Sequence, residues 1–76
     1  MLTLKHLRYF ESLARHGHFG RAAEVSAISQ PALSMQIKEL EALLGAPLVE
    51  RGRQLRLTPF GEDFLAKARA ILRQVD

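Results

Sequence analysis

Residues 29–45, SQPALSMQIKELEALLG, decide the fold, because they carry every signal of one well-delimited helix. Ser29 is a suitable N-cap, and Pro31 lies in the first turn, where a missing N–H does no harm. Gly45 ends the helix, and Pro47 prevents it from starting again. Apolar residues at spacings of three and four predict a buried stripe of Leu33, Ile37, Leu40 and Leu44.

The face opposite this stripe is polar at its N-terminal end and carries Gln30, Pro31, Ser34, Met35 and Lys38. Glutamine can pair with adenine through two hydrogen bonds, serine can donate or accept, and proline and methionine can touch a thymine methyl group. A lysine can reach a phosphate, and the helix N-terminus adds a partial positive charge. The surface suits DNA bases, but an ordinary solvated helix face is the alternative.

Two helices are predicted before this segment. The first spans residues 3–16, with Thr3 as its cap. Its apolar stripe consists of Leu4, Leu7, Phe10, Leu13 and Ala14. The second is short, residues 19–26, and a tight connection follows it, with Val25 and Ile28 expected in the shared core.

A hairpin and a last helix are predicted after it. Residues 48–57 predict two short strands around a turn at residues 52–54, supported by the helices. Thr58-Pro59 then begins a helix. This order predicts a mainly α winged helix-turn-helix, with a three-helix core, a two-stranded wing and a long linker or dimerisation helix. We expect residues 1–58 to form the DNA-binding domain and residues 59–76 the linker helix. This order of elements favours DNA binding by the polar face of residues 30–38 over an ordinary solvated helix face.

The hairpin carries three arginines within six residues. Arg53, at the predicted tip, is expected to enter a minor groove or to grip phosphates. Arg51 is expected to contact the DNA backbone, although it could instead be held against Glu50 or a helix end. Arg56 can equally lie on the solvent face of its strand.

The last helix has an apolar face that continues to the end of the sequence. Phe60 and Phe64 are expected to anchor it inward. The expected dimerisation seam consists of Leu65, Ala68, Ile71, Leu72 and Val75. Packing on its own domain alone is the alternative. Because the face reaches Asp76 without a C-cap, we expect that the sequence belongs to a longer protein.

Composition excludes several classes of protein. The 76 residues suffice for one domain, and the lack of cysteine excludes disulfides and thiolate metal sites. His16 and His18 have no carboxylate cluster beside them and are expected to be a cap and a surface residue, so we expect no metal and no cofactor. No apolar run approaches the length of a membrane span, and the expected compartment is the cytoplasm. The net charge of +3 is a modest surplus that favours a polyanionic partner.

Two other classes of function are alternatives. A winged helix can dock a protein partner instead of DNA, in which case binding would depend neither on salt nor on Arg53. A small enzyme would need a catalytic arrangement, but the serines lack a histidine–acid pair and the carboxylates suggest no acid–base pair. We therefore predict a binding domain and not an enzyme.

Several motifs occur together over essentially the whole chain. They are Gly17-His18-Phe19-Gly20-Arg21-Ala22-Ala23-Glu24, Ile28-Ser29-Gln30-Pro31-Ala32-Leu33-Ser34, Ile37-Lys38-Glu39-Leu40-Glu41, Leu44-Gly45, Pro47-Leu48-Val49-Glu50-Arg51 and Leu57-Thr58-Pro59-Phe60-Gly61. This series resembles the N-terminal domain of LysR-type transcriptional regulators. Two runs, HFGRAA at 18–23 and SMQIK at 34–38, are also similar to the peroxide-sensing branch of that family.

The resemblance implies a homodimer, or a tetramer in the full-length protein, whose last helices pair antiparallel and which binds double-stranded DNA at interrupted palindromes. It also implies a small-molecule effector, bound by a following domain that this sequence does not contain. The positions that match base contacts are Gln30, Pro31, Ser34 and Met35. Those that match contacts of the backbone or the wing are Arg21, Lys38, Arg51 and Arg53.

The sequence departs from the family pattern at several positions. Met35 stands where the family often has arginine, which removes one charged contact. Val49 replaces the usual phenylalanine, and the wing is one residue shorter. His18 and Gly20 occupy positions where the family often has hydroxyl side chains, which weakens the phosphate contact expected there.

Overall fold

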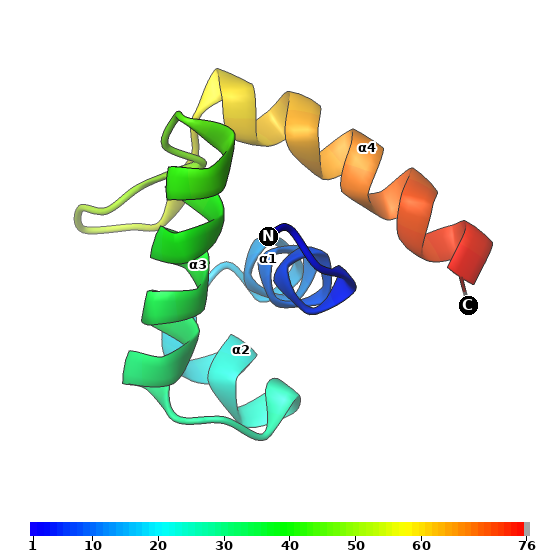
Figure 1. Ribbon diagram of the computed structural model, residues 1–76. Helices are drawn as coiled ribbons and strands as arrows, with labels where there is room; N and C mark the ends of the chain where they lie inside the picture. The colour runs from blue at the N-terminus through cyan, green and yellow to red at the C-terminus, as the bar shows by residue number, and fades with distance from the viewer. Residues whose placement is uncertain (76) are drawn as a thin grey trace.

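The structure is a computed structural model that describes residues 1–75, and Figure 1 shows how its helices surround a common core. The helices are α1 (Leu4–His16), α2 (Phe19–Ser26), α3 (Gln30–Leu44) and α4 (Pro59–Val75). Helix α2 lies beside the N-terminal end of α3, and α4 starts near the other end of α3 and extends away from it (Figure 1). Within residues 1–75 no helix is both long and apolar enough to span a bilayer.

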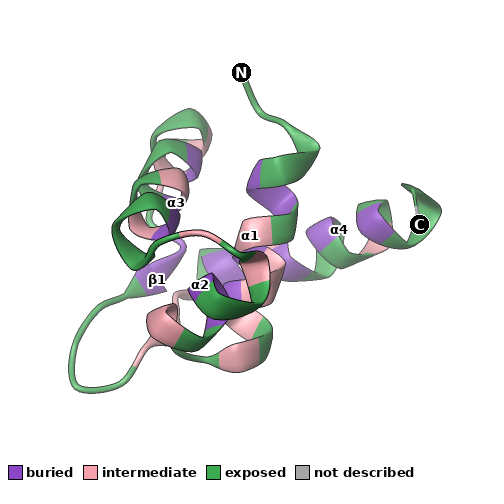
Figure 2. Ribbon diagram, turned by 90° about the horizontal axis from the view of Figure 1, so that it is seen from below, coloured by how far each residue is buried: buried purple, intermediate pink, exposed green. Residues whose placement is uncertain are grey.

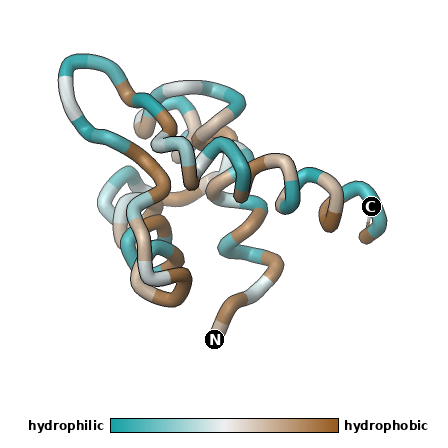
Figure 3. Tube along the Cα trace, turned by 90° about the horizontal axis from the view of Figure 1, so that it is seen from above, coloured by the Kyte–Doolittle hydropathy of each residue, from teal (hydrophilic) through white to brown (hydrophobic). Residues whose placement is uncertain are grey.

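The wing has shorter strands than the sequence predicted. Strand β1 (Val49–Glu50) pairs antiparallel with β2 (Arg56–Leu57), and Val49 lies opposite Leu57. The loop covers residues 51–55 and is therefore longer than the turn predicted at residues 52–54. Leu48, which was predicted in the first strand, lies outside β1. The loop projects from the body as a mostly hydrophilic segment (Figure 3).

Local capping signals mark the starts and ends of the helices at the residues that the sequence predicted. The hydroxyl of Ser29 accepts the N–H of Ala32 at 3.1 Å, which caps the start of α3. Gly17 and Gly45 end α1 and α3 in the left-handed region, with φ of 66° and 79°. Ala27 ends α2 in the same region, with φ of 58°, and so provides the tight connection to α3.

The core lies where the inner faces of the helices meet (Figure 2). Its fully buried large side chains are Phe10, Leu13, Leu33, Ile37, Leu40 and Leu48. Ala22 and Ala23 are buried as well, and their small size lets α2 approach its neighbours closely. Val25 was expected in the core but is 60% exposed, because it lies on the outer side of α2; Ile28 does pack against the core.

His6 takes the buried place at the start of α1 that the apolar pattern assigned to Leu4. The His6 residue is 3% exposed, whereas Leu4 is 42% exposed. Its Nδ1 accepts the backbone N–H of Thr3 at 3.0 Å, and its Nε2 lies 2.6 Å from Oε1 of Glu39. Because a backbone N–H can only donate, Nδ1 is the acceptor and Nε2–H donates to the carboxylate. This contact connects the beginning of α1 to α3.

Helix α4 packs on α1 through three side chains that were expected in a dimer seam. Leu65, Ala68 and Leu72 are at most 8% exposed, and Ala68 and Leu72 cluster with Leu7 of α1. The structure corrects this part of the expectation, because these side chains are already covered by their own domain. Ile71 and Val75, also expected in the seam, are 46% and 51% exposed. Asp76, the last residue of the expected linker, lies outside the described residues.

The two phenylalanines of α4 behave differently from each other. Phe64 packs against the core and against Phe10, with 5.8 Å between ring centroids. Phe60, which was expected to anchor inward, is 39% exposed and stacks on Phe64 at 6.3 Å. The reason is position: Phe60 lies in the first turn of α4, where the neighbouring Gly61 takes the buried place.

The start of α4 is bonded to the base of the wing. The hydroxyl of Thr58 accepts the N–H of Gly61 at 2.9 Å and donates to the carbonyl of Pro47 at 2.8 Å. The N–H of Thr58 donates to the carbonyl of Leu48 at 3.0 Å. A Cβ on Gly61 would overlap the Leu48 carbonyl oxygen and lie 3.0 Å from the carbonyl carbon. The Thr-Pro-x-Gly motif is therefore a cap followed by a close backbone contact.

Candidate nucleic-acid interface

The N-terminal half of α3 has the two faces that the sequence predicted. Leu33, Ile37 and Leu40 are fully buried. Gln30, Pro31, Met35 and Lys38 are exposed, and Ser34 is half-buried. Met35 is 69% exposed, so its apolar surface is accessible. The predicted base-contacting surface is thus free to meet another molecule.

A groove of about 580 Å³ lies between α3, the start of α2 and the wing. Four of the eight predicted DNA contacts line it, namely Gln30, Ser34, Arg51 and Arg53. Residues 17–20, Gly52, Gln54 and Leu55 also line the groove. It therefore combines hydrogen-bonding side chains with two guanidinium groups, which suits an anionic chain with polar edges.

The other four predicted contacts lie outside this groove. Pro31, Met35 and Lys38 are exposed on α3, and Arg21 is exposed on α2. None of the four lines the groove. A ligand that touches all eight residues must therefore extend over the surface of α3 as well as enter the groove.

Arg51 is held at the base of the wing by two neighbours. Its guanidinium lies 5.4 Å from the centre of the Phe19 ring, and its Nη1 is 3.9 Å from Oε1 of Glu41. The sequence left open whether Glu50 or a helix end would hold this arginine. The second alternative applies, because Glu41 lies near the C-terminal end of α3. The Arg51 side chain remains 40% exposed, so part of it can still meet a ligand.

Glu41 fixes the wing relative to α3, a role that the sequence analysis missed. Its Oε2 accepts the N–H of Leu48 at 2.7 Å and that of Val49 at 3.3 Å. These bonds join a carboxylate near the end of α3 to the first residues of the wing. The base of the wing is consequently held to α3 by a short polar link. The only signal in the sequence is an acidic residue a few positions before a strand, which is not specific.

His18 belongs to the groove as well, and it caps α2 as one of the two histidines was expected to do. Its Nδ1 accepts the N–H of Arg21 at 3.1 Å. A Cβ on Gly20 would lie 3.0 Å from Cε1 of His18 and 3.5 Å from Oε1 of Gln30. Gly20 therefore leaves room for the imidazole beside the glutamine.

The family model for bacterial regulatory helix-turn-helix proteins of the lysR family matches residues 4–62, which is most of the chain. The chain belongs to the lysR family. The matched residues run from the start of α1 to the first turn of α4, so they include the groove and the wing.

Curated relatives of this lysR-family chain are transcriptional regulators. An uncharacterised regulator, YnfL, of Escherichia coli is 51% identical over 76 residues, which are 99% of this chain and 26% of the relative. The SDS degradation transcriptional activation protein of a Pseudomonas species is 52% identical, over 95% of this chain and 24% of the relative. The chain thus spans about a quarter of the length of these relatives. Their names agree with the prediction that the chain is not an enzyme.

Solved structures of the family confirm the winged helix-turn-helix fold. Full-length OxyR from Pseudomonas aeruginosa superposes with a TM-score of 0.94 and 47% identity, covering 99% of this chain and 26% of that one. The DNA-binding domain of BenM, in a complex with a catB DNA site, superposes with a TM-score of 0.96 and 43% identity, covering 99% and 85%. Because regulators of several kinds match this lysR-family chain at similar identity, the comparisons do not single out the peroxide-sensing branch.

Proposed function

We propose that this lysR-family domain binds double-stranded DNA sequence-specifically, as the DNA-binding part of a transcriptional regulator. One observation carries the proposal: the exposed surface from Gln30 to Lys38 lies beside a groove that ends in the arginines of the wing. A helix with such a surface fits the major groove, and a wing beside it reaches the adjacent backbone. The likeness to a DNA-binding domain captured on DNA supports the same arrangement.

Base recognition is assigned to four side chains of α3. Gln30 offers an amide that can bond both polar atoms of an adenine edge, and Ser34 can donate or accept beside it. Pro31 and Met35 offer apolar contact to thymine methyl groups. All four lie in the first two turns of α3, which is the part of a recognition helix that meets base edges.

Backbone contacts are assigned to four cations around these side chains. Lys38 lies one turn further along α3, and Arg21 lies on α2. Arg51 and Arg53 belong to the wing loop, where they grip phosphates or enter the minor groove. These charges position the domain on the duplex but carry no sequence information themselves.

Dimerisation is assigned to the outer side of α4, with residues 59–76 as the linker helix of the proposal. Phe60, Ile71 and Val75 leave apolar surface exposed there. A second copy of the chain would cover this apolar surface by packing its own α4 antiparallel against it. Such a dimer fits an interrupted palindrome, with half-sites about one helical turn, roughly 34 Å, apart.

The remaining features of the proposed regulator follow from the family. A small-molecule effector would act through a further domain, and assembly into tetramers would also depend on it. A regulator that binds a bacterial chromosome works in the cytoplasm.

The test is a comparison of selected and random DNA. A duplex is selected with the wild-type chain from a randomised pool, and binding is measured by fluorescence anisotropy over a series of salt concentrations. Gln30→Ala is expected to weaken binding to the selected duplex by about 1–3 kcal/mol and to leave random DNA unchanged. Arg53→Ala, the control, is expected to weaken both and to flatten the salt dependence. Equal losses for Gln30→Ala on both duplexes would refute the assignment of base recognition.

A further inference from the structure

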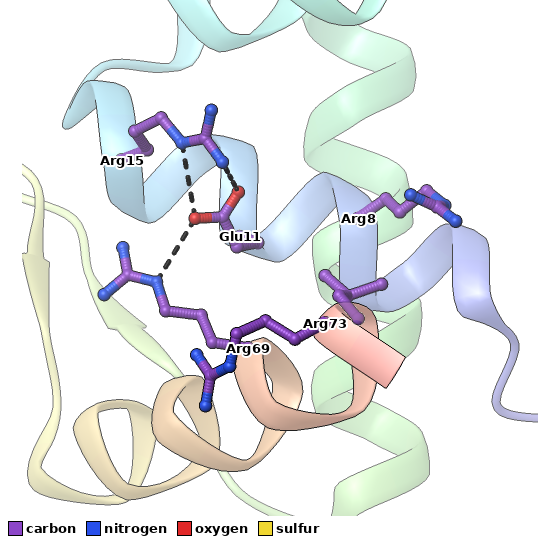
Figure 4. Close-up of a pocket in the computed structure, with 6 residues that line it drawn as sticks. Arg8, Glu11, Arg15, Arg69 and Arg73 are labelled. Carbon is purple, nitrogen blue, oxygen red and sulfur yellow. Dashed lines mark hydrogen bonds and ion pairs between the residues drawn. The ribbon is translucent and has the colours of Figure 1, made fainter. Parts of the chain in front are cut away.

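A second groove, of about 570 Å³, lies between α1 and α4, away from the surface described above. Arg8 and Arg15 of α1 and Arg69 and Arg73 of α4 line it, with Glu11 among them (Figure 4). The Glu11 side chain is 12% exposed, and its carboxylate joins both helices. Its Oε1 accepts from Nη2 of Arg15 at 2.8 Å, and its Oε2 accepts from Nε of Arg69 at 3.2 Å.

The groove is rich in cations. Among the described residues it is lined by four of the 11 lysines and arginines of the chain and by one carboxylate, that of Glu11. This carboxylate lies between a cation of α1, Arg15, and a cation of α4, Arg69. Glu11 therefore attracts both arginines, and its attraction to Arg69 acts between the two helices.

Apolar side chains also join α1 and α4 among residues 1–75, and such contacts are not directional. Leu7 packs on Ala68 and Leu72, and such contacts tolerate small rotations better than a hydrogen bond does. The start of α4 is fixed separately, where Gly61 meets Leu48. Arg69 is eight residues further along, about 12 Å at the rise of an α-helix. Its bond to Glu11 thus holds α4 against α1 well beyond the fixed start.

We propose that Glu11 is a positioning residue that sets the direction of α4 relative to α3 and thereby the distance between half-sites that a dimer accepts. The proposal rests on the dimer proposed above. Residues two apart on a helix point about 200° away from each other, so Arg69 and Ile71 lie on nearly opposite sides of α4. A partner seated on Ile71 and Val75 therefore leaves the contact between Glu11 and Arg69 in place.

The geometry makes half-site spacing sensitive to this direction. The domain measures 31 × 26 × 21 Å, and we take its shortest dimension, 21 Å, as the length of the lever that joins α4 to α3. A swing of about 10° on such a lever displaces the recognition helix by about 3.5 Å, which is the rise of about one base pair. A loose α4 therefore lets a dimer accept several spacings, whereas a fixed one selects a single spacing.

The experiment measures spacing preference with matched charge changes. Duplexes carry two selected half-sites whose separation increases one base pair at a time, and the ratio of affinities at the best and the neighbouring spacings is determined. Arg69→Met and Glu11→Gln are expected to lower this ratio at least threefold. Arg15→Met also removes one positive charge that binds the Glu11 carboxylate, but Arg15 lies on α1 and does not link that carboxylate to α4. This variant is therefore expected to leave the ratio unchanged within twofold.

Three results would overturn the proposal. One is an unchanged ratio in Arg69→Met, and another is an equal fall in Arg15→Met, which would assign the effect to charge alone. The third is a wild-type chain that binds two half-sites without any spacing preference, which would show that α4 is not held in one direction, whereas binding as a monomer would refute the dimer instead. Thermal melting of each variant accompanies the assay, because a general loss of stability lowers affinity at all spacings alike and leaves the ratio intact. If Glu11→Gln fails to fold, Arg69→Met decides the matter.

Discussion

Gly61→Ala is expected to destabilise the domain strongly, although alanine is the better helix former. The added methyl group would overlap the carbonyl oxygen of Leu48. Both groups belong to backbone, and that carbonyl already accepts the N–H of Thr58 at 3.0 Å, so no side chain can rotate out of the way. The first turn of α4 must instead move away from the base of the wing.

The size of the effect follows from two opposing contributions. Overpacking costs about 1–3 kcal/mol, and a contact between two backbone segments places this case at about 3 kcal/mol. Alanine recovers about 1 kcal/mol of helix propensity relative to glycine. The net loss is about 2 kcal/mol, and at roughly 4–8 °C per kcal/mol for a domain of this size the melting temperature falls by roughly 8–16 °C.

The assay is thermal unfolding of the 76-residue chain, followed by circular dichroism, with Gly52→Ala as its control. A Cβ on Gly52 would meet no atom within 4 Å, and its backbone is not in the left-handed region. The control is therefore expected to melt within about 2 °C of the wild type, as for an exposed substitution. A Gly61→Ala variant that also melted within about 2 °C would show that the close approach to Leu48 is not constraining.

Two further substitutions test the local interactions on either side of α3. Glu41→Gln replaces a charged acceptor of the Leu48 N–H by a neutral one and is expected to lower the unfolding free energy, measured by urea titration, by about 1 kcal/mol. Its control is Glu50→Gln, at the exposed end of β1, which is expected to change the unfolding free energy by less than about 0.5 kcal/mol. Ala27→Gly is expected to raise the unfolding free energy by about 0.5–1 kcal/mol, because glycine adopts the observed φ of 58° without strain, and a loss of stability would contradict this.

The helix boundaries could be predicted because each depends on a few adjacent residues. Ser29 caps α3, Gly45 ends it and Thr58 caps α4, and each signal is complete within one turn of helix. The exposed face of α3 followed from helical periodicity in the same way. These local signals are sufficient to predict the candidate interface, because its main surface belongs to a single helix.

Contacts between distant segments could not be predicted, because they leave no periodic pattern. His6 and Glu39 are 33 positions apart, and nothing near either residue indicates the other. The apolar face of α4 posed a related difficulty. Periodicity showed which residues share a face, but not that Leu65 and Leu72 would be covered by α1 while Ile71 stayed exposed.

Leu48 explains how a domain of this size keeps its elements in fixed positions. Its N–H is bound by Glu41 of α3, its carbonyl by the N–H of Thr58, and its backbone abuts Gly61 of α4. The side chain is fully buried, so the residue cannot shift without disturbing the core. These contacts join the recognition helix, the wing and the first turn of α4 at a single residue. Any adjustment of α4 must occur beyond this junction, where Glu11 is its polar link to α1 among residues 1–75.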